Sequence, residues 1–401
     1  MEDSLEQVEQ SHNNKICILP WVHQFGTLSG SYGLCCFSEY FTGFGHGKSP
    51  LEAFNDDHMK SIRLAMLAGE EVEPCKVCYD WERSGVESPR QRSNKRFFKY
   101  TRLYDQTAED GSVNNPPIYI DFRFGNLCNF TCRMCGAFSS SSWAKEAKHH
   151  GHLDESAPNH YDHWTNNESF WRDIDKFKEY IKVIYFAGGE PFVQEGHYKL
   201  LEFLVKNNCT DIELNYNTNL SYERSLKSYD IEELWSNFSK VGVWPSIEGY
   251  KEKAEYNRKG LEWDLFCKNV DRFDKYITTF SMLSNVYTIT SNLETIKYLK
   301  SLNKNFHITN LVGPSHLSTT IFSKDVKKSI MSNYKNELYD MTNILERDEM
   351  NCILDSLRHM NSSDDSHLQK LFKHHNRLMD RYRNESFECV FPELAEWYLN
   401  I

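Results

Sequence analysis

The chain has 401 residues, of which 40% are hydrophobic and 14% aromatic, a composition typical of folded rather than disordered proteins. That length favours two or three domains, and the formal net charge of −11 without a basic block argues against a general nucleic-acid or anionic-membrane binder. The first residues are acidic, and no apolar run approaches the roughly 20 residues that span a bilayer, so we expect a cytoplasmic protein with no membrane partner.

Eight of the 12 cysteines lie within the first 135 residues. A cytoplasmic compartment is reducing, so metal binding explains this crowding better than disulfide bonds do. The candidate ligands nearest the N-terminus are Cys17, Cys35, Cys75 and Cys78. Cys36 is an alternative to Cys35. Four thiolates suit a zinc ion and an iron–sulfur cluster about equally, and the spacing leaves both open.

One helix is expected between Cys36 and Cys75, and a connector after Cys78. The helix is predicted over about 51–67, and residues 80–116 are polar and rich in turn signals. We interpret Arg90 and Arg92 as part of a solvated face of this connector. A contact with a substrate anion is the less favoured alternative.

From Pro117 to Pro314 strands and helices alternate. The predicted strands are 118–124, 183–187, 211–216, 241–247, 277–283 and 307–312. The predicted helices begin near 143 and then cover 165–181, 195–207, 229–238, 263–276 and 293–302, the second opening with a Thr165–Glu168 capping box. Six such units imply a parallel sheet, and they are too few for an eight-stranded barrel, so we expect an open partial (β/α)6 TIM-like barrel.

Two further segments carry weaker signals. Residues 148–164 are irregular and rich in histidine, and we favour a surface loop over a second metal site because no histidine pair recurs at ligand spacing. Residues 324–401 are charged and helical by pattern. The expected organisation is therefore an N-terminal cysteine-rich module and linker over 1–112, the barrel over 113–315, and a helical extension over 316–401.

Three cysteines directly follow the first barrel strand. Cys128, Cys132 and Cys135 fall within eight residues, and three thiolates leave one position of a four-point soft-metal site unfilled. Such an open position indicates chemistry more often than a purely structural site.

Other polar and glycine positions follow the ends of later strands. Because the active site of a barrel lies at the C-terminal ends of its strands, we expect these positions to converge on the cysteine loop. They are Gly188, Gly189 and Glu190 after the second strand, Asn219 after the third, Ser246 and Glu248 at the fourth, Asn285 after the fifth and Gly313 after the sixth.

The spacing Cys128-x3-Cys132-x2-Cys135 after a strand resembles that of the radical SAM superfamily. Gly188-Gly-Glu-Pro191 resembles its second motif, which holds the amino group of S-adenosylmethionine, and Ser246 with Arg258 resembles its fourth-strand serine and downstream arginine. The cysteines nearer the N-terminus resemble the "twitch" module with one auxiliary cluster, here placed before the barrel as in N-terminal twitch radical SAM proteins. Met134 and Leu220 depart from the family pattern, where an aromatic residue and a glycine are common.

The resemblance implies a radical SAM enzyme. It implies that Cys128, Cys132 and Cys135 hold a [4Fe–4S] cluster with an open iron site, and that Gly188, Gly189, Glu190, Asn219, Ser246 and Arg258 contact S-adenosylmethionine. Reductive cleavage of that cofactor would give a 5′-deoxyadenosyl radical that takes hydrogen from a substrate, with one auxiliary [4Fe–4S] cluster and an electron donor such as flavodoxin or ferredoxin.

The substrate and two other protein classes stay open. By analogy with relatives, a peptide or protein side chain is favoured as substrate, with a sugar or nucleotide as the alternative. A zinc-stabilised binding protein is the runner-up from another class. An electron-transfer protein with two closed clusters leaves Gly188, Glu190 and Arg258 unexplained.

Overall fold

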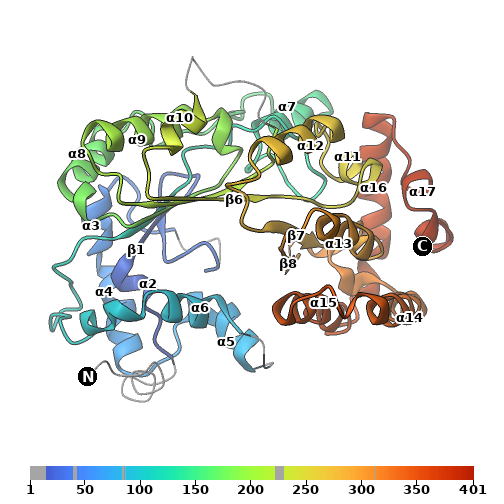
Figure 1. Ribbon diagram of the computed structural model, residues 1–401, viewed down its shortest axis with the longest axis horizontal. Coiled ribbons are helices and arrows are strands. Elements are labelled where there is room, and N and C mark those ends of the chain that lie inside the picture. The colour runs from blue at the N-terminus through green and yellow to red at the C-terminus, as the bar shows by residue number, and fades with distance from the viewer. Residues whose placement is uncertain (1–14, 39–42, 84, 86, 222–229, 312) are drawn as a thin grey trace. The chain divides into compact units, whose positions relative to one another are not determined.

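The computed structural model describes residues 15–38, 43–83, 85, 87–221, 230–311 and 313–401 (Figure 1). The chain forms two compact units, each made of several segments. The first unit consists of Met1–Asn126, Tyr161–Asn215 and Ser225–Val241, and the second of Leu127–His160, Tyr216–Arg224 and Gly242–Ile401. The three-segment organisation expected from the sequence stays a prediction. The expected ends of helix 229–238 and strand 307–312, at positions 229 and 312, lie outside the described residues.

A six-stranded, mostly parallel sheet is the centre of the fold. Its strand order is β2-β1-β3-β4-β5-β6. The strands are β1 (His23–Gly26), β2 (Tyr32–Gly33), β3 (Tyr119–Phe122), β4 (Val183–Phe186), β5 (Glu213–Thr218) and β6 (Lys240–Pro245). β3 pairs in parallel with both β1 and β4, whereas β2 is antiparallel to β1. The prediction of strands β3 to β6 is confirmed. β1 and β2 were not predicted, because His-Gln-Phe-Gly and Tyr-Gly carry no apolar alternation.

Helices α8 (Glu168–Phe177), α9 (Glu195–Lys206) and α10 (Ile231–Trp235) lie along one face of the sheet in the first unit (Figure 1). The helix predicted over 165–181 is present over the shorter range of α8, which buries Phe170, Ile174 and Phe177. The predicted capping box is wrong by two residues: Asn167 is the N-cap, and its side chain accepts a hydrogen bond from the Phe170 N–H. Short 3-10 helices follow at η3 (Lys178–Tyr180) and η4 (Pro191–Val193).

The segment up to residue 112 is more helical than the sequence predicted. Its elements are α2 (Leu19–Val22), α3 (Pro50–Phe54), α4 (Asp57–Leu67), η1 (Glu73–Cys75), α5 (Lys76–Arg83), α6 (Pro89–Arg96) and η2 (Phe98–Leu103). The helix predicted over 51–67 is broken because Asp56 caps α4. The connector predicted over 80–116 is wrong: α6 has its own capping box at Ser88, and Phe97, Leu103 and Tyr104 join a buried core with Trp21.

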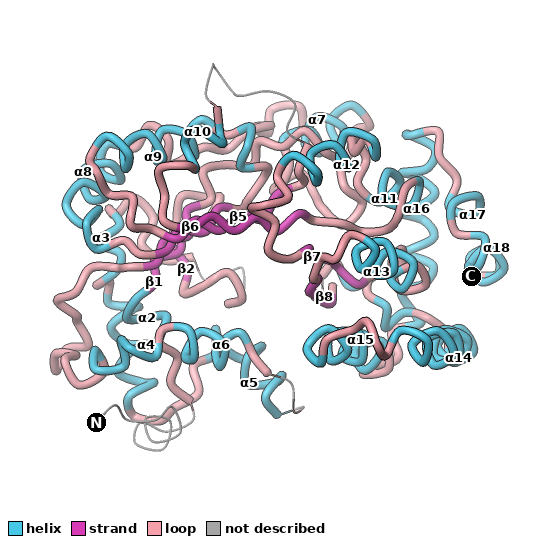
Figure 2. The backbone as a smooth tube through the Cα atoms, in the orientation of Figure 1, coloured by secondary structure: helices cyan, strands magenta, loops and turns pink. Residues whose placement is uncertain are grey.

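The second unit contains the remaining β/α elements. They are α7 (Ser141–His149), α11 (Glu252–Asn257), α12 (Trp263–Arg272), β7 (Phe280–Ser284), α13 (Asn292–Ser301) and β8 (Phe306–Asn310). β7 and β8 form a parallel pair (Figure 2), and the single parallel bridges Val243–Ile277 and Ser246–Ser281 connect the β6 segment to the β7 segment. The last two predicted strands are therefore also present.

The C-terminal part of the second unit is helical, as predicted. Its elements are η6 (Ser315–Leu317), η7 (Thr319–Ile321), α14 (Lys324–Met341), α15 (Arg347–Met360), η8 (Ser366–Leu368), α16 (Gln369–Arg383), α17 (Phe387–Val390), η9 (Pro392–Leu394) and α18 (Ala395–Asn400). α15 packs against β8. In the described part of the chain, no helix combines the length and the apolar character that a membrane crossing needs.

Candidate metal and cofactor site

Hydrogen bonds to backbone carbonyls fix the conformation of the cysteine loop, residues 128–135, in the second unit. The Cys135 N–H donates to the Cys132 carbonyl at 3.0 Å, which closes a turn. Ser142 Oγ and Trp143 Nε1, at the start of α7, donate to the carbonyls of Cys128 and Cys132 at 2.7 Å and 2.9 Å. The Ser140 side chain caps α7 by accepting from the Trp143 N–H. The helix that follows the loop, α7, therefore helps to set the loop geometry.

The three thiols of this loop interact with one another. A hydrogen bond with Cys135 lowers the pKa of Cys132 and raises that of Cys135, and the charge of Cys128 also raises the pKa of Cys135. The positive charge of Arg258 lowers the pKa of both thiols, but the hydrogen bond with Cys132 and burial leave the pKa of Cys135 well above its ordinary value, so the thiolate is favoured only at Cys132. Thiolates are the form in which cysteine binds metal. The structure thus brings Cys128, Cys132 and Cys135 together beside a cation.

Arg258 is buried rather than part of a surface ion pair. Its Nη1 forms a short ion pair with Glu248, which follows β6, and its guanidinium lies 5.9 Å from the centre of the Phe130 ring. Its Nε is buried and has no hydrogen-bond partner. The Glu248–Arg258 pair therefore keeps one donor available. The role of Glu248 as the partner of Arg258 was missed in the sequence, because the two residues are ten positions apart.

Asn219 is connected to the cysteine loop. Its Nδ2 donates to Asn129 Oδ1 at 2.9 Å, and its Oδ1 accepts from the Ser221 N–H and hydroxyl. Leu220, the departure from the family pattern, has φ +57° and is fully buried. The backbone keeps the left-handed conformation that glycine adopts most readily, at a cost of about 1 kcal/mol for leucine.

Ser246 lies at the end of β6. The Ser246 N–H donates to the Thr218 carbonyl, at the end of β5, at 2.8 Å, and its side chain is half-buried. Asn285, after β7, is fully buried and caps the following turn by accepting from the Tyr287 N–H at 2.8 Å. Asn285 therefore has a structural role.

The four cysteines of the first unit form a second group. The charge of Cys17 raises the pKa of both Cys35 and Cys75, and Cys78 also acts on each of the other three. Burial is the largest cause of these shifts and raises the pKa of Cys17 and of Cys35 to about 12. Three of these thiols are buried and Cys35 is half-buried, and a bound metal would be one way to turn such thiols into thiolates at neutral pH. The charges that act on the pKa of Cys36 are those of Asp121, its neighbour Cys35 and Arg123, and not those of Cys17, Cys75 or Cys78, which favours Cys35 as the fourth member.

Arg90 supports the four-cysteine group, contrary to the solvated face expected from the sequence. Its side chain is 5% exposed, forms two contacts with Glu82 at 2.9 Å and 2.6 Å, and donates to the Ile16 carbonyl at 2.6 Å. The Arg90 charge lowers the pKa of Cys17. Asn94, one turn later on α6, also binds this segment by accepting from the Ile18 N–H at 2.8 Å. Arg92 is half-exposed and donates to the Glu87 carbonyl.

The Gly188–Pro191 turn follows β4 in the first unit. Gly188 and Gly189 have φ +83° and +55°, which favours glycine at both positions. Gln194 Nε2 donates to the carbonyls of Gly188 and Gly125. Glu190 is 1% exposed, and its carboxylate accepts from the Phe192 N–H at 3.1 Å. The turn is therefore rigid, and Glu190 has a structural contact there.

A buried ion pair on β3 was missed in the sequence. Asp121 is fully buried and accepts from Arg123 Nη2 at 2.8 Å, while Asp121 Oδ1 and Arg123 Nε have no partner. Arg123 lies 5.4 Å and 5.3 Å from the rings of Phe25 and Tyr185. A side chain on Gly188 would come within 2.9 Å of Arg123 Cδ. The signal was present: in the strand sequence Tyr-Ile-Asp-Phe-Arg-Phe the polar residues all fall on one face.

The histidine-rich loop contacts the C-terminal helices of the second unit. The His150 ring stacks on Tyr382 with centroids 3.6 Å apart, and His152 Nε2 lies 2.9 Å from the Tyr382 hydroxyl.

Among the described residues, no group of three or more His, Cys, Asp or Glu side chains is arranged so that it could hold a metal ion. An iron–sulfur cluster occupies more space between its cysteines than a single ion does.

No protein-family model matches this chain, and no curated protein matches it.

Proposed function

We propose that this protein is a radical SAM enzyme with one auxiliary iron–sulfur cluster. The proposal rests above all on the division of seven cysteines into two groups. Cys17, Cys35, Cys75 and Cys78 interact with one another in the first unit, and Cys128, Cys132 and Cys135 do so in the second. The group of four suits a closed cluster, and the group of three leaves one iron open for a cofactor.

Several residues of the second unit fit a bound cluster and S-adenosylmethionine. Cys128, Cys132 and Cys135 would hold three irons, and Arg258 offsets part of their negative charge. The unpartnered Nε of Arg258 offers a donor to an anionic group such as the cofactor carboxylate. Asn219 is tied to Asn129 in the loop. When bound, the cluster and S-adenosylmethionine supply radical hydrogen-abstraction chemistry.

The Gly188-Gly189-Glu190 turn belongs to the first unit, and its contact with the amino group of the cofactor is proposed from the resemblance alone. Beside it, the half-satisfied Asp121–Arg123 pair offers one acceptor and one donor that are already desolvated. Such a pair suits a substrate group that both donates and accepts a hydrogen bond, such as an amide. A sugar hydroxyl or a nucleobase edge also donates and accepts, so a peptide or protein substrate is favoured by the resemblance alone, with a sugar or nucleotide as the alternative.

The proposed architecture is an open barrel of the six strands β3 to β8. The parallel bridges between the β6 and β7 segments, together with the parallel β7–β8 pair, support this arrangement. β1 extends the sheet at its other side by pairing with β3. The N-terminal cysteine module would then share the sheet of the barrel rather than form a separate domain.

The decisive experiment combines metal analysis with a cleavage assay. After anaerobic reconstitution we expect about eight irons per chain, and reduction in the presence of S-adenosylmethionine should release 5′-deoxyadenosine. Cys132→Ala should abolish that release and remove about half of the iron. Release that survives Cys132→Ala would refute the proposal.

Two matched serine variants test the four-cysteine group. Cys35→Ser should lose the auxiliary cluster, whereas Cys36→Ser should keep it, since Cys35 interacts with Cys17, Cys75 and Cys78 and Cys36 interacts chiefly with Asp121. A protein that takes up about two zinc ions per chain, without visible absorbance, would instead be the zinc-stabilised binding protein.

A further inference from the structure

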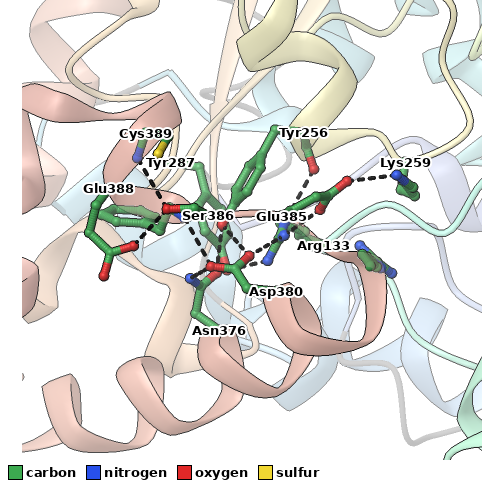
Figure 3. A network of polar contacts seen from close by, with 12 residues as sticks. Arg133, Tyr256, Lys259, Tyr287, Asn376, Asp380, Glu385, Ser386, Glu388 and Cys389 are labelled. Carbon is green, nitrogen blue, oxygen red and sulfur yellow. Dashed lines mark hydrogen bonds and ion pairs between the residues drawn. The ribbon is translucent and has the colours of Figure 1, made fainter.

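A buried polar network in the second unit begins inside the cysteine motif (Figure 3). Arg133 lies directly after Cys132, and its side chain is fully buried. Its Nε donates to the Tyr256 carbonyl at 3.1 Å, and its Nη1 to Asn376 Oδ1 at 2.9 Å. Its Nη2 donates to Asp380 and to Glu385, both at 2.6 Å. The guanidinium therefore binds three side chains of the C-terminal segment.

The aromatic residues around Arg133 restrict it further. Its guanidinium lies 3.6 Å from the centre of the Tyr256 ring. The Tyr256 hydroxyl donates to Asp380 at 2.8 Å, and the Tyr287 hydroxyl donates to Asn376 at 3.0 Å. Asp380 and Asn376, which accept hydrogen bonds from Arg133, are thus also oriented by the two tyrosine hydroxyls. The planar guanidinium of Arg133 contacts the Tyr256 ring on its face and forms hydrogen bonds at its edges, so these contacts together fix its position and orientation.

One of the two carboxylates that bind Arg133 is also close to a second cation. Arg133 and Lys259 are the cations, and Asp380 and Glu385 are the anions; Lys259 Nζ lies 2.8 Å from Glu385. Because Asp380 and Glu385 already pair with its guanidinium, we expect Arg133 to act on the loop mainly through its position and not through its charge.

The backbone around Arg133 is hydrogen-bonded to the segment 256–259, which also contains Tyr256 and Lys259 of the network. The Arg133 N–H donates to the Asn257 carbonyl and the Thr131 N–H to the Lys259 carbonyl, both at 2.9 Å. These bonds flank Arg258, the cation beside the thiols. From α16, Arg383 Nη2 donates to the Thr131 carbonyl at 2.7 Å. The cysteine loop and the 256–259 segment are therefore joined to α16 at several points.

We infer that Arg133 is a positioning residue through which α16 and the turn after it hold the cysteine loop in its cluster-binding form. The inference gives residues 369–385 of the C-terminal extension a role, and it rests on the proposed function. Binding is reciprocal in such an arrangement: if α16 stabilises the cluster-binding loop, a bound cluster stabilises α16.

The test compares Arg133→Lys with Arg63→Lys in the full-length, reconstituted protein. Arg63 is a matched control because it is also fully buried and donates to the Pro20, Phe54 and Gly111 carbonyls, far along the chain from the loop. Lysine keeps the charge at both positions but removes the fork. We expect Arg133→Lys to lose about half of the iron, or to lose the change in the electron paramagnetic resonance signal on addition of S-adenosylmethionine. Arg63→Lys should keep both.

Hydrogen exchange gives a readout that does not depend on catalysis. Loading wild-type protein with iron and sulfide should slow amide exchange in α16, and Arg133→Lys should abolish this slowing. Full iron content, an unchanged resonance signal and preserved slowing in Arg133→Lys would overturn the inference. The wild-type sample tests the proposed function separately, because a wild-type chain that binds no loop cluster would refute that function itself.

Discussion

At the scale of single residues, Arg123 lies close to Gly188. Gly188 belongs to the turn proposed to contact the cofactor, and Arg123 belongs to the ion pair with Asp121 that is proposed to bind the substrate. Gly188 has φ +83°, and a Cβ there would lie 2.9 Å from Arg123 Cδ. Arg123 in turn holds Asp121 at 2.8 Å. A side chain at position 188 must therefore disturb both the turn and the ion pair.

We predict that Gly188→Ala weakens binding of S-adenosylmethionine by about tenfold or more, equivalent to about 1.4 kcal/mol. Gly47→Ala is the matched control, because Gly47 has a similar φ of +81° but a Cβ at that position would meet no atom within 4 Å. Both variants carry the left-handed strain of about 1 kcal/mol, and only Gly188→Ala adds the collision. Isothermal titration calorimetry measures the affinities. Equal affinities for wild type and Gly188→Ala would contradict the prediction.

Asp121 should make stability depend on pH. Burial raises the pKa of Asp121 to about 6, and Arg123 opposes that rise. The folded state then binds a proton more tightly than the unfolded state, so this contribution to stability is present below the unfolded pKa of about 4 and is lost as the pH rises through 6.

From this shift we expect the free energy of unfolding to fall by about 1 kcal/mol between pH 5 and pH 7.5 on account of Asp121. Asp121→Asn should remove that part of the pH dependence. Urea unfolding of both proteins across this range measures it, and identical pH profiles would show that Asp121 does not titrate there.

At the scale of elements, α6 shows what local sequence patterns miss. Its sequence, Pro-Arg-Gln-Arg-Ser-Asn-Lys-Arg, has no apolar stripe, and so the sequence predicted a connector. The helix is stabilised instead by its Ser88 capping box and by polar contacts from Arg90 and Asn94 to residues 16–18. Those partners lie more than 70 positions away, and periodicity carries no information about them. The same holds for Asp380 and Glu385, which pair with Arg133 from about 250 positions away.

Arg90→Leu should lower the free energy of unfolding by about 3–5 kcal/mol, because it leaves Glu82 without its partner in a mostly buried ion pair. It should also reduce binding of the auxiliary cluster, since Arg90 holds the Ile16 carbonyl next to Cys17. Arg92→Leu, on the same helix but half-exposed, should change stability by less than about 0.5 kcal/mol. Chemical denaturation and iron analysis of the two variants give the comparison. Similar losses in both would show that the buried ion pair is not the cause.

At the scale of the whole molecule, the sequence predicted the parts better than their grouping. Six strands and most of the helices between them follow from local alternation and from 3.6-residue periodicity, and the structure contains all six strands. The two compact units are assembled from segments that are distant in the chain, such as residues 127–160 with 242–401. That grouping depends on long-range packing and on pairs such as β1 with β3, for which the sequence offers no local signal.

Removal of metal should speed amide exchange in some parts of the first unit and not in others. Cys17 and Cys75 belong to the same buried core as Trp21 and Phe54, so an auxiliary cluster would join the segment before α2 to η1 and α5 across that core. Metal binding adds to folding stability because it occurs only in the folded site. Chelation of iron should therefore speed amide exchange in residues 16–22 and 73–96, while α9, which packs over the sheet, keeps its protection. Equal acceleration in α9 would indicate that the unit opens as a whole, and no acceleration anywhere in the unit would show that the four cysteines hold no metal.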